Sequence, residues 1–320
     1  MPKSVKVEVP GKLFIAGEYA VTRPGGLAIV AAVAADFSVS IKAAKGLSKM
    51  RTNVGLDGFS FKLQDLLRSD MIDLKSDWNF ALMAIKKMLE AVGSLKSEVE
   101  IEIQSGLGFG KNKKGYGSSA AVVCGIVKAL NQFFNLKLSL MEEFKIAADA
   151  HVTVQGSGSC GDIAAIIYGG TVFYRNRDLI EPLLLPDWDS YVIATGKSVK
   201  TGEKLEASKL SEAFFERSDD IVKKLSIVQS FTDFKQGLLK NQELLRENIS
   251  GNYVTEKLDL ALKAVNSHPR LAGKISGAGF GENLIVFSDA VSQGEISLLM
   301  QSLEQKGMKM EVLKIAESAR

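Results

Sequence analysis

Apolar and polar residues alternate along several short stretches in the first half of the chain. The clearest is "EVEIEIQ", where Val99, Ile101 and Ile103 face one way and three glutamates face the other. Residues 5–9 and 37–41 follow the same rule. A period of two residues is typical of a strand with one face buried, so these patterns predict β-strands.

Other stretches repeat with helical spacing, and the two kinds of pattern alternate through both halves. Such alternation predicts an α+β protein in which helices pack on mainly antiparallel sheets. The predicted helices of the first half cover residues 77–92, 120–134 and 140–151. In the second half we expect a strand "SYVIAT", long helical segments between residues 205 and 249, the segment "GKISGAGFGENLIVF", a helix near 293–306 and a closing strand "MKMEVLKIA".

The pattern changes character near residues 182–186, and we place a domain boundary there. The chain of 320 residues is 46% hydrophobic and is long enough for two domains, each with its own core. We therefore expect an N-terminal domain over residues 1–185 and a C-terminal domain over residues 186–320. No internal repeat or low-complexity linker interrupts them.

Charge and cysteine content narrow the class of protein. A formal net charge of +3 gives no reason to expect nucleic acid as a partner. The first residues alternate where a secretion signal would be continuously apolar, and no run is long enough for a membrane span. Two cysteines, Cys124 and Cys160, form no disulfide framework and are expected to be buried thiols. We expect a cytoplasmic protein, monomeric or homodimeric, that does not act at membranes.

The stretch "KKGYGSSAAVVCGI" places two glycines and two serines directly before an apolar helix. Gly115 and Gly117 let the backbone approach a ligand, and Ser118 or Ser119 stands where a helix N-cap belongs. The first turn of a helix carries unpaired N–H groups at the positive end of its dipole, which suits phosphate oxygens. The same residues also fit a capped helix after a flexible turn. The spacing of a Walker A loop is absent.

Two further segments, "VPGKLFIAGEYAV" and "QGSGSCGDIAA", place charged residues among glycines in apolar surroundings. Asp162 is followed by "IAAIIYGG", so its carboxylate is expected to be partly enclosed and to need a partner, for which Lys12 is a candidate. A buried ion pair can equally be structural. The GxGxxG spacing that begins at Gly156 follows a helical pattern instead of a strand, which argues against a dinucleotide fingerprint.

The segments "PGKLFIAGEYAV", "GYGSSAAV" and "KISGAGFGE" resemble, in order and separation, the three motifs of the GHMP small-molecule kinases. Within this family the chain is most similar to the bacterial phosphomevalonate kinases, through "GEYAV" and "QGSGSCGD". The resemblance implies a ribosomal-protein-like N-terminal domain that binds ATP and a ferredoxin-like C-terminal domain. It also implies MgATP as the phosphoryl donor.

The resemblance carries roles to individual residues of this chain. Lys12 and Asp162 match the catalytic lysine and aspartate, and Ser119 matches the serine that also reaches Mg²⁺. The phosphate loop matches Gly115, Gly117, Ser118, Ser119 and Ala120. The expected contacts of the acceptor are Tyr19, Lys111, Lys114, Ser159, Ser276, Gly277 and Ala278.

The implied reaction is phosphorylation of (R)-5-phosphomevalonate to 5-diphosphomevalonate by ATP, in the mevalonate pathway of isoprenoid biosynthesis. A phosphorylated acceptor favours extra cations near the loop, and Lys111, Lys113 and Lys114 are candidates, although such a run also fits a solvated turn. In the third motif Phe280 replaces a glycine, Glu282 an aspartate and Asn283 a cysteine. These departures keep two alternatives open: mevalonate kinase or another GHMP kinase, and a non-catalytic relative that binds ATP and regulates a partner.

Overall fold

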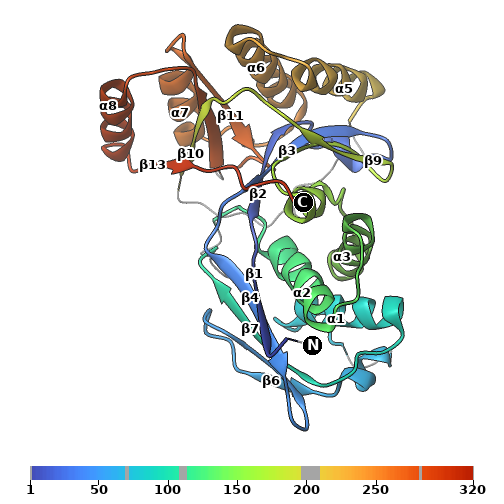
Figure 1. Cartoon of the computed structure of the whole chain (residues 1–320). Coiled ribbons are helices and arrows are strands. Elements are labelled where there is room, and N and C mark those ends of the chain that lie inside the picture. Colours follow the sequence, from blue (N-terminus) through green and yellow to red (C-terminus); the bar gives the residue numbers. More distant parts are fainter. Residues whose placement is uncertain (1, 69–71, 108–113, 196–209, 281–282, 320) are drawn as a thin grey trace. The chain divides into compact units, whose positions relative to one another are not determined.

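The contacts within the chain divide it into two compact units in a computed structural model that describes residues 2–68, 72–107, 114–195, 210–280 and 283–319. The first unit comprises Met1–Gly11 and Ala34–Tyr168, with Ala319, and the second comprises Lys12–Val33 and Gly169–Ser318. Both units contain helices and strands, so the α+β prediction is confirmed (Figure 1). Within the described residues, no helix has the length and apolar character that a membrane span requires.

The first unit is a five-stranded sheet with helices packed against it. The strand order is β1-β4-β7-β5-β6, in which only β5 and β7 pair in parallel. The strands are β1 (Ser4–Glu8), β4 (Phe37–Ala43), β5 (Ser48–Thr52), β6 (Phe59–Phe61) and β7 (Val99–Ser105). The helices are η2 (Leu63–Leu67), α1 (Asn79–Val92), α2 (Ser118–Phe134), α3 (Leu140–Gln155) and α4 (Gly161–Tyr168).

Helix α2 is the centre of this unit. It contacts β1, β4 and the helices α1, α3 and α4, and eleven of its residues are buried (Figure 1). Its apolar residues cover most of its circumference, so the prediction of a buried helix is confirmed. The alternation in β7 is also confirmed, because Val99, Ile101 and Ile103 are buried while Glu102 is exposed. The prediction that the thiols of Cys124 and Cys160 are buried is confirmed.

The second unit contains two four-stranded sheets. One has the order β2-β3-β8-β9 and the other β11-β12-β10-β13. The strands are β2 (Gly11–Ala16), β3 (Leu27–Val33), β8 (Thr171–Arg175), β9 (Leu179–Leu183), β10 (Asp189–Ala194), β11 (Leu271–Ser276), β12 (Asn283–Ser288) and β13 (Lys309–Leu313). The helices are η1 (Ala20–Thr22), α5 (Glu212–Ser226), α6 (Phe231–Asn248), α7 (Glu256–Asn266) and α8 (Gln293–Glu304).

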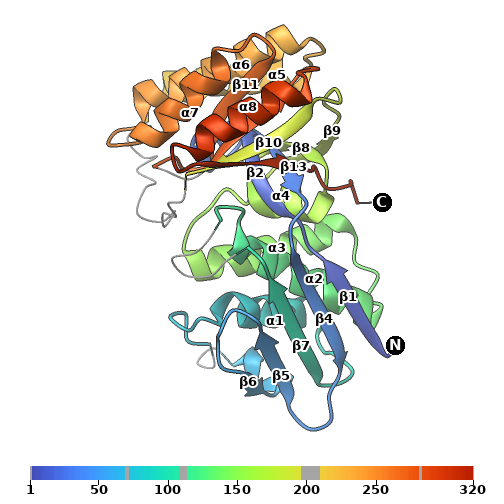
Figure 2. The same cartoon turned by 90° about the vertical axis from the view of Figure 1, so that its left-hand side faces the viewer.

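The second sheet of this unit has the ferredoxin-like order. Each adjacent pair of its strands is antiparallel, and β10 leads through helices to β11 and β12, after which α8 leads to β13. Helices α6, α7 and α8 contact this sheet and lie along it in Figure 2. The ferredoxin-like prediction for the C-terminal part is therefore confirmed.

The contact units differ from the single boundary near residue 185 that the pattern suggested. Strands β2 and β3 pair with β8 and β9, so residues 12–33 join the second unit although they lie near the N-terminus. The hairpin of β8 and β9 also belongs to that unit. The division into domains 1–185 and 186–320 stays a prediction.

Gly125 sets the distance between α2 and the sheet of the first unit. A Cβ at this position would lie 2.6 Å from Val39 Cγ2 and 2.9 Å from Val9 Cγ2. We expect Gly125→Ala to lower the free energy of unfolding in urea by about 1–3 kcal/mol through overpacking, although alanine is the better helix former by about 1 kcal/mol. Gly294 on α8 is a matched control, because a Cβ there would have only Ser292 Oγ nearby, at 4.0 Å. Equal stability of Gly125→Ala and Gly294→Ala would contradict the close packing of α2.

Candidate active site

The start of helix α2 is built by glycines in left-handed conformations. Gly115 and Gly117 have φ values of 78° and 77°, which side chains rarely adopt, and Gly117 is the N-cap. The expectation that Ser118 or Ser119 caps this helix is wrong: both lie within its first turn, and no described side chain caps it. Serine or threonine side chains do cap α3, α5, α6, α7 and α8.

An uncapped first turn leaves backbone N–H groups for a ligand. The N–H groups of Ser118, Ser119 and Ala120 are among those that have no partner inside the helix, and the helix dipole adds partial positive charge there. Ala120 is buried and has no polar side-chain atom, so its backbone N–H is the one group that it could offer to a ligand. The structure thus brings the five predicted phosphate-loop residues together on one turn, in a geometry suited to an anion.

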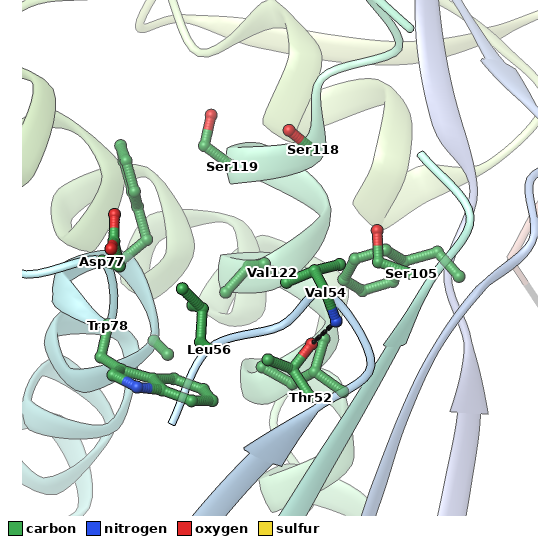
Figure 3. Close-up of a pocket in the computed structure, with 13 residues that line it drawn as sticks. Thr52, Val54, Leu56, Asp77, Trp78, Ser105, Ser118, Ser119 and Val122 are labelled. Atoms are coloured by element: carbon green, nitrogen blue, oxygen red, sulfur yellow. Dashed lines mark hydrogen bonds between the residues drawn. The ribbon is translucent and has the colours of Figure 1, made fainter. Parts of the chain in front are cut away.

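An apolar pocket lies beside this turn. Its empty space amounts to about 580 Å³, and this figure includes space that is open to solvent. Figure 3 shows Ser118 and Ser119 at one end of the lining and the Trp78 ring farther away, with Val122 and Leu56 between them. The lining residues are Phe37, Thr52, Val54, Leu56, Asp77, Trp78, Phe80, Ala81, Ile103, Ser105, Ser118, Ser119 and Val122.

Hydrogen bonds fix parts of the pocket wall. Trp78 Nε1 donates to the carbonyl oxygen of Asp57 at 3.1 Å, which orients the indole. Val54 N donates to Thr52 Oγ1 at 3.4 Å, drawn in Figure 3, and this bond shapes the turn after β5. The pocket is not visible in the sequence, because its walls come from separate segments and only the two serines belong to a recognisable motif. A planar apolar group joined to phosphates would fit this combination of pocket and turn.

The basic residues before α2 are only partly described. Lys114 is exposed. Its backbone N donates to the carbonyl oxygen of Leu107 at 3.0 Å, so Lys114 lies next to Leu107, two residues after the end of β7. Lys111 and Lys113 lie outside the described residues. Their roles, and that of Lys114 toward an acceptor, stay predictions.

Asp162 lies in the first turn of α4. Its carboxylate is partly exposed, and Oδ1 accepts a hydrogen bond from Ile163 N at 2.9 Å. Just before it, Ser159 Oγ accepts from Gly161 N at 3.4 Å, and Cys160 has a left-handed φ of 60°. The remaining apolar residues of α4 are buried, so the carboxylate stands at the boundary of the core, as the sequence predicted.

Lys12 belongs to the second unit, on β2. Its side chain is partly buried, and Nζ lies 5.6 Å from the centre of the Phe14 ring. A cation over an aromatic face gains electrostatic stabilisation while the charge stays available to a second partner. Since Lys12 and Asp162 belong to different units, their pairing stays a prediction.

In the second unit, the structure brings the first and third motifs together. Tyr19 is buried, and its hydroxyl donates to the carbonyl oxygen of Ala278 at 2.6 Å. Ser276 is 3% exposed, and its Oγ has no hydrogen-bond partner among the described residues. Gly277 continues the turn with a φ of 85°. Four of the predicted acceptor residues, Tyr19 and 276–278, therefore lie in one region of this unit, and their contact with an acceptor stays a prediction.

Sequence analysis missed a charged pair at the same place. Glu18 and Lys274 form an ion pair with exposed side-chain fractions of 3% and 0%. Burial lowers the pKa of Lys274 below its ordinary value, and the charge of Glu18 acts in the opposite direction. Glu18 was visible in "GEYAV" and Lys274 in "KISGAG", but nothing in either segment pointed to the other.

The described residues contain no cluster of three His, Cys, Asp or Glu side chains that could hold a metal by itself. At the start of α2 only the hydroxyl oxygens of Ser118 and Ser119 could bind a cation, because the backbone N–H groups there are suited to anions. This set fits Mg²⁺, which is usually held by one or two protein oxygens together with substrate phosphates and water.

Part of the chain matches a known family model. Residues 79–170 match the family model described as "GHMP kinases N terminal domain". The matched segment contains α2 with its glycine turn and α4 with Asp162.

Relatives along nearly the whole chain carry two activities in their names. The phosphomevalonate kinase of Streptomyces sp. (strain CL190) is 27% identical, and the match covers 96% of each chain. The mevalonate kinase of Methanocaldococcus jannaschii is also 27% identical, over 91% of this chain and 94% of the relative. Equal identity to both leaves the acceptor undecided at this level.

The fold as a whole matches solved kinase structures. The phosphomevalonate kinase of Streptococcus pneumoniae, solved in complex with phosphomevalonate and AMPPNP, has a TM-score of 0.82 at 20% identity, and the match covers 99% of each chain. At this identity the likeness concerns the fold alone.

Proposed function

We propose that the chain is a GHMP kinase and that it transfers the γ-phosphoryl group of ATP to (R)-5-phosphomevalonate. The product is 5-diphosphomevalonate, an intermediate of the mevalonate pathway. The observation that carries the proposal is the uncapped, glycine-built first turn of α2 beside an apolar pocket. The kinase relatives of the mevalonate pathway support the choice of pathway, and the Streptomyces relative supports the acceptor.

In this proposal the pocket holds the purine base and the first turn of α2 holds the phosphates. The apolar walls at Leu56, Trp78 and Val122 favour a planar base. Backbone N–H groups after Gly117 donate to phosphate oxygens. Ser119 would supply a hydroxyl to Mg²⁺ together with those oxygens, and the metal would supply charge neutralisation for the transferring group.

Phosphoryl transfer needs positioning and charge stabilisation more than covalent help from the protein. An oxygen of the acceptor phosphate attacks the γ-phosphorus, the bond to the β,γ-bridging oxygen breaks, and ADP leaves with the electron pair. In this proposal Lys12 stabilises the charge on the transferring group, and Asp162 orients the acceptor. The second ionisation of a phosphate monoester lies near pH 6, so at neutral pH the attacking oxygen needs no base.

Two alternatives are distinguishable by their acceptors. Mevalonate kinase has equal support from identity to the Methanocaldococcus relative, and its acceptor is an alcohol whose proton must be removed. A non-catalytic relative that binds ATP and regulates a partner would use no acceptor. The presence of both Lys12 and Asp162 favours catalysis over this second alternative.

The proposed acceptor is tested by ADP release with phosphomevalonate, mevalonate and galactose offered side by side. We expect the highest kcat/KM with phosphomevalonate. Lys111→Ala and Lys114→Ala should raise the KM for that acceptor by up to about tenfold, the loss of one charge-assisted bond of ~1.4 kcal/mol. Lys145→Ala, an exposed lysine on α3, is the control and should change nothing. A higher kcat/KM with mevalonate would show that the proposed acceptor is wrong.

The assignment of the base to the pocket is tested by filling it. Val122→Phe places a larger side chain on the wall and should weaken ATP binding by about tenfold or more. Inhibition by magnesium tripolyphosphate, which has no base, should stay within about twofold of wild type. Val312→Phe, at a 65% exposed position of β13, is the control. Equal losses for ATP and tripolyphosphate would place the base elsewhere.

The role of Asp162 is tested by the pH dependence of kcat/KM for phosphomevalonate. Asp162→Asn keeps the shape of the side chain and removes its charge, so kcat should fall because the acceptor is misplaced. The rise in rate near pH 6 should persist, because it belongs to ionisation of the substrate. Asp149→Asn, at a 60% exposed side chain on α3, is the control and should keep wild-type kcat. Loss of the rise in Asp162→Asn alone would identify Asp162 as the titrating base.

A further inference from the structure

The most deeply buried charges described in the second unit lie beneath the loops of the first and third motifs. Glu18 lies between Gly17 and Tyr19, and Lys274 lies in β11, two residues before Ser276. They pair across 256 positions of sequence, and neither is more than 3% exposed. An isolated buried charge is strongly unfavourable, so each of these side chains depends on the other.

Two neighbouring amides of α6 hold the two motifs from the same side. Asn241 Oδ1 accepts from Gly17 N at 3.3 Å, and Asn241 Nδ2 donates to Glu18 Oε2 at 3.4 Å. Gln242 Oε1 accepts from Ile275 N at 2.8 Å, next to Lys274. Both amide side chains are buried. One turn of one helix therefore fixes the backbone before Tyr19 and the strand before Ser276.

Aromatic side chains join the tips of the two loops. The Tyr253 ring packs edge to face against Tyr19, with centroids 6.5 Å apart, and against Phe280, with centroids 6.2 Å apart. The carbonyl oxygen of Tyr253 accepts from Phe280 N at 2.9 Å. A Cβ on Gly279 would lie 2.2 Å from Tyr253 Cδ2, so the loop follows the face of this ring closely. The phenylalanine that departs from the family pattern thus has a packing partner.

The backbone above this cluster is strained on both loops. Tyr19 and Phe280 have φ values of 63° and 61°, in the left-handed region that non-glycine residues rarely occupy. Such conformations persist only where surrounding contacts hold them. A buried ion pair stabilises a fold less than apolar packing of the same volume, but it restricts which geometries are compatible with burial. Stability alone therefore does not account for charges at this place.

We propose that Glu18, Lys274 and Asn241 are positioning residues that hold the loops of the first and third motifs in the geometry that binds the acceptor. They act through Tyr19, whose hydroxyl is tied to Ala278, and through Ser276, whose hydroxyl lacks a described partner. This inference rests on the proposed function, because it assigns those loops to the acceptor. It predicts that removal of the pair affects the acceptor more than ATP.

The test compares Glu18→Gln/Lys274→Met with a control pair on the surface of α7, Asp259→Asn/Lys263→Met. Joint replacement leaves no buried charge unpaired, which favours folding of the double variant. We expect the KM for phosphomevalonate to rise at least about tenfold in the buried double variant, with the KM for MgATP within about twofold of wild type. The control pair should change neither. An unchanged acceptor KM, or equal rises for acceptor and MgATP, would overturn the proposal.

A second measurement is independent of the acceptor. Amide hydrogen exchange at 17–19 and 276–280 should accelerate by about tenfold or more in the buried double variant and not in the control. Unchanged exchange in both loops would overturn positioning even if activity fell. If wild type phosphorylates neither phosphomevalonate nor mevalonate, the proposed function fails while this measurement still decides the positioning role.

If the double variant does not fold, Tyr19→Phe tests whether the two loops are held together. It removes only the hydroxyl that donates to Ala278 and keeps the ring against Tyr253. Faster exchange confined to 276–280, with a cooperative unfolding transition retained, supports the tie between the loops. Exchange equal to wild type in this variant would overturn it.

Discussion

The first turn of α2 has no side-chain cap, because its N-cap is Gly117, and the proposed chemistry depends on the backbone N–H groups that are left unpaired there. The body of the helix is fixed by burial, with Gly125 pressed against Val39 and Val9, so the turn cannot shift to find another partner. Five other described helices satisfy their first turns with serine or threonine side chains. At α2 the two serines follow the N-cap instead of occupying it. Backbone donors and hydroxyls are then both left for phosphate oxygens.

In the second unit, buried contacts hold together two loops that are far apart in sequence, 17–19 and 277–280. Glu18 and Lys274 are compatible with burial only when paired, and α6 adds amide partners on either side. The left-handed backbone at Tyr19 and Phe280 is held by the aromatic contacts with Tyr253. Substitution of a glycine by Phe280 is thereby accommodated within the third motif. Rigid loops reduce the ordering cost of binding a small acceptor.

The sequence predicted the elements whose patterns are local. Alternation found β1, β4 and β7, and periodicity found α1, α2, α3 and α8, because each pattern reflects one face turned toward a core. It did not find β3, whose residues are all buried and apolar and so show no alternation. It also did not find β2, because Lys12 is the only polar side chain in that strand, although burial alternates over its first residues. The sequence also showed no sign that residues 12–33 belong to the second unit. That assignment depends on the pairing of β3 with β8, which is distant in sequence.

Candidate site residues could likewise be predicted where their signal is local and not where it depends on distant segments. Glycines and serines at 115–119 were visible because their chemistry is contiguous, while the pocket beside them was not, since Leu56, Trp78 and Val122 come from three segments. The sequence predicted Ser118 or Ser119 as the N-cap, one or two residues after the observed cap, Gly117. Serine is a common cap, whereas glycine has no side chain that would indicate one. Glu18 and Lys274 were each present in a quoted motif, but pairing across 256 positions has no local signature.

The most direct measurement of the central claim is a crystal structure of the protein with Mg²⁺ and a non-hydrolysable ATP analogue. The account predicts phosphate oxygens about 3 Å from the backbone nitrogens of the first turn of α2, with Ser119 Oγ facing the metal. The base should lie against Leu56, Trp78 and Val122. Phosphates bound away from α2, with a serine hydroxyl turned back to cap its own helix and the pocket empty, would contradict it.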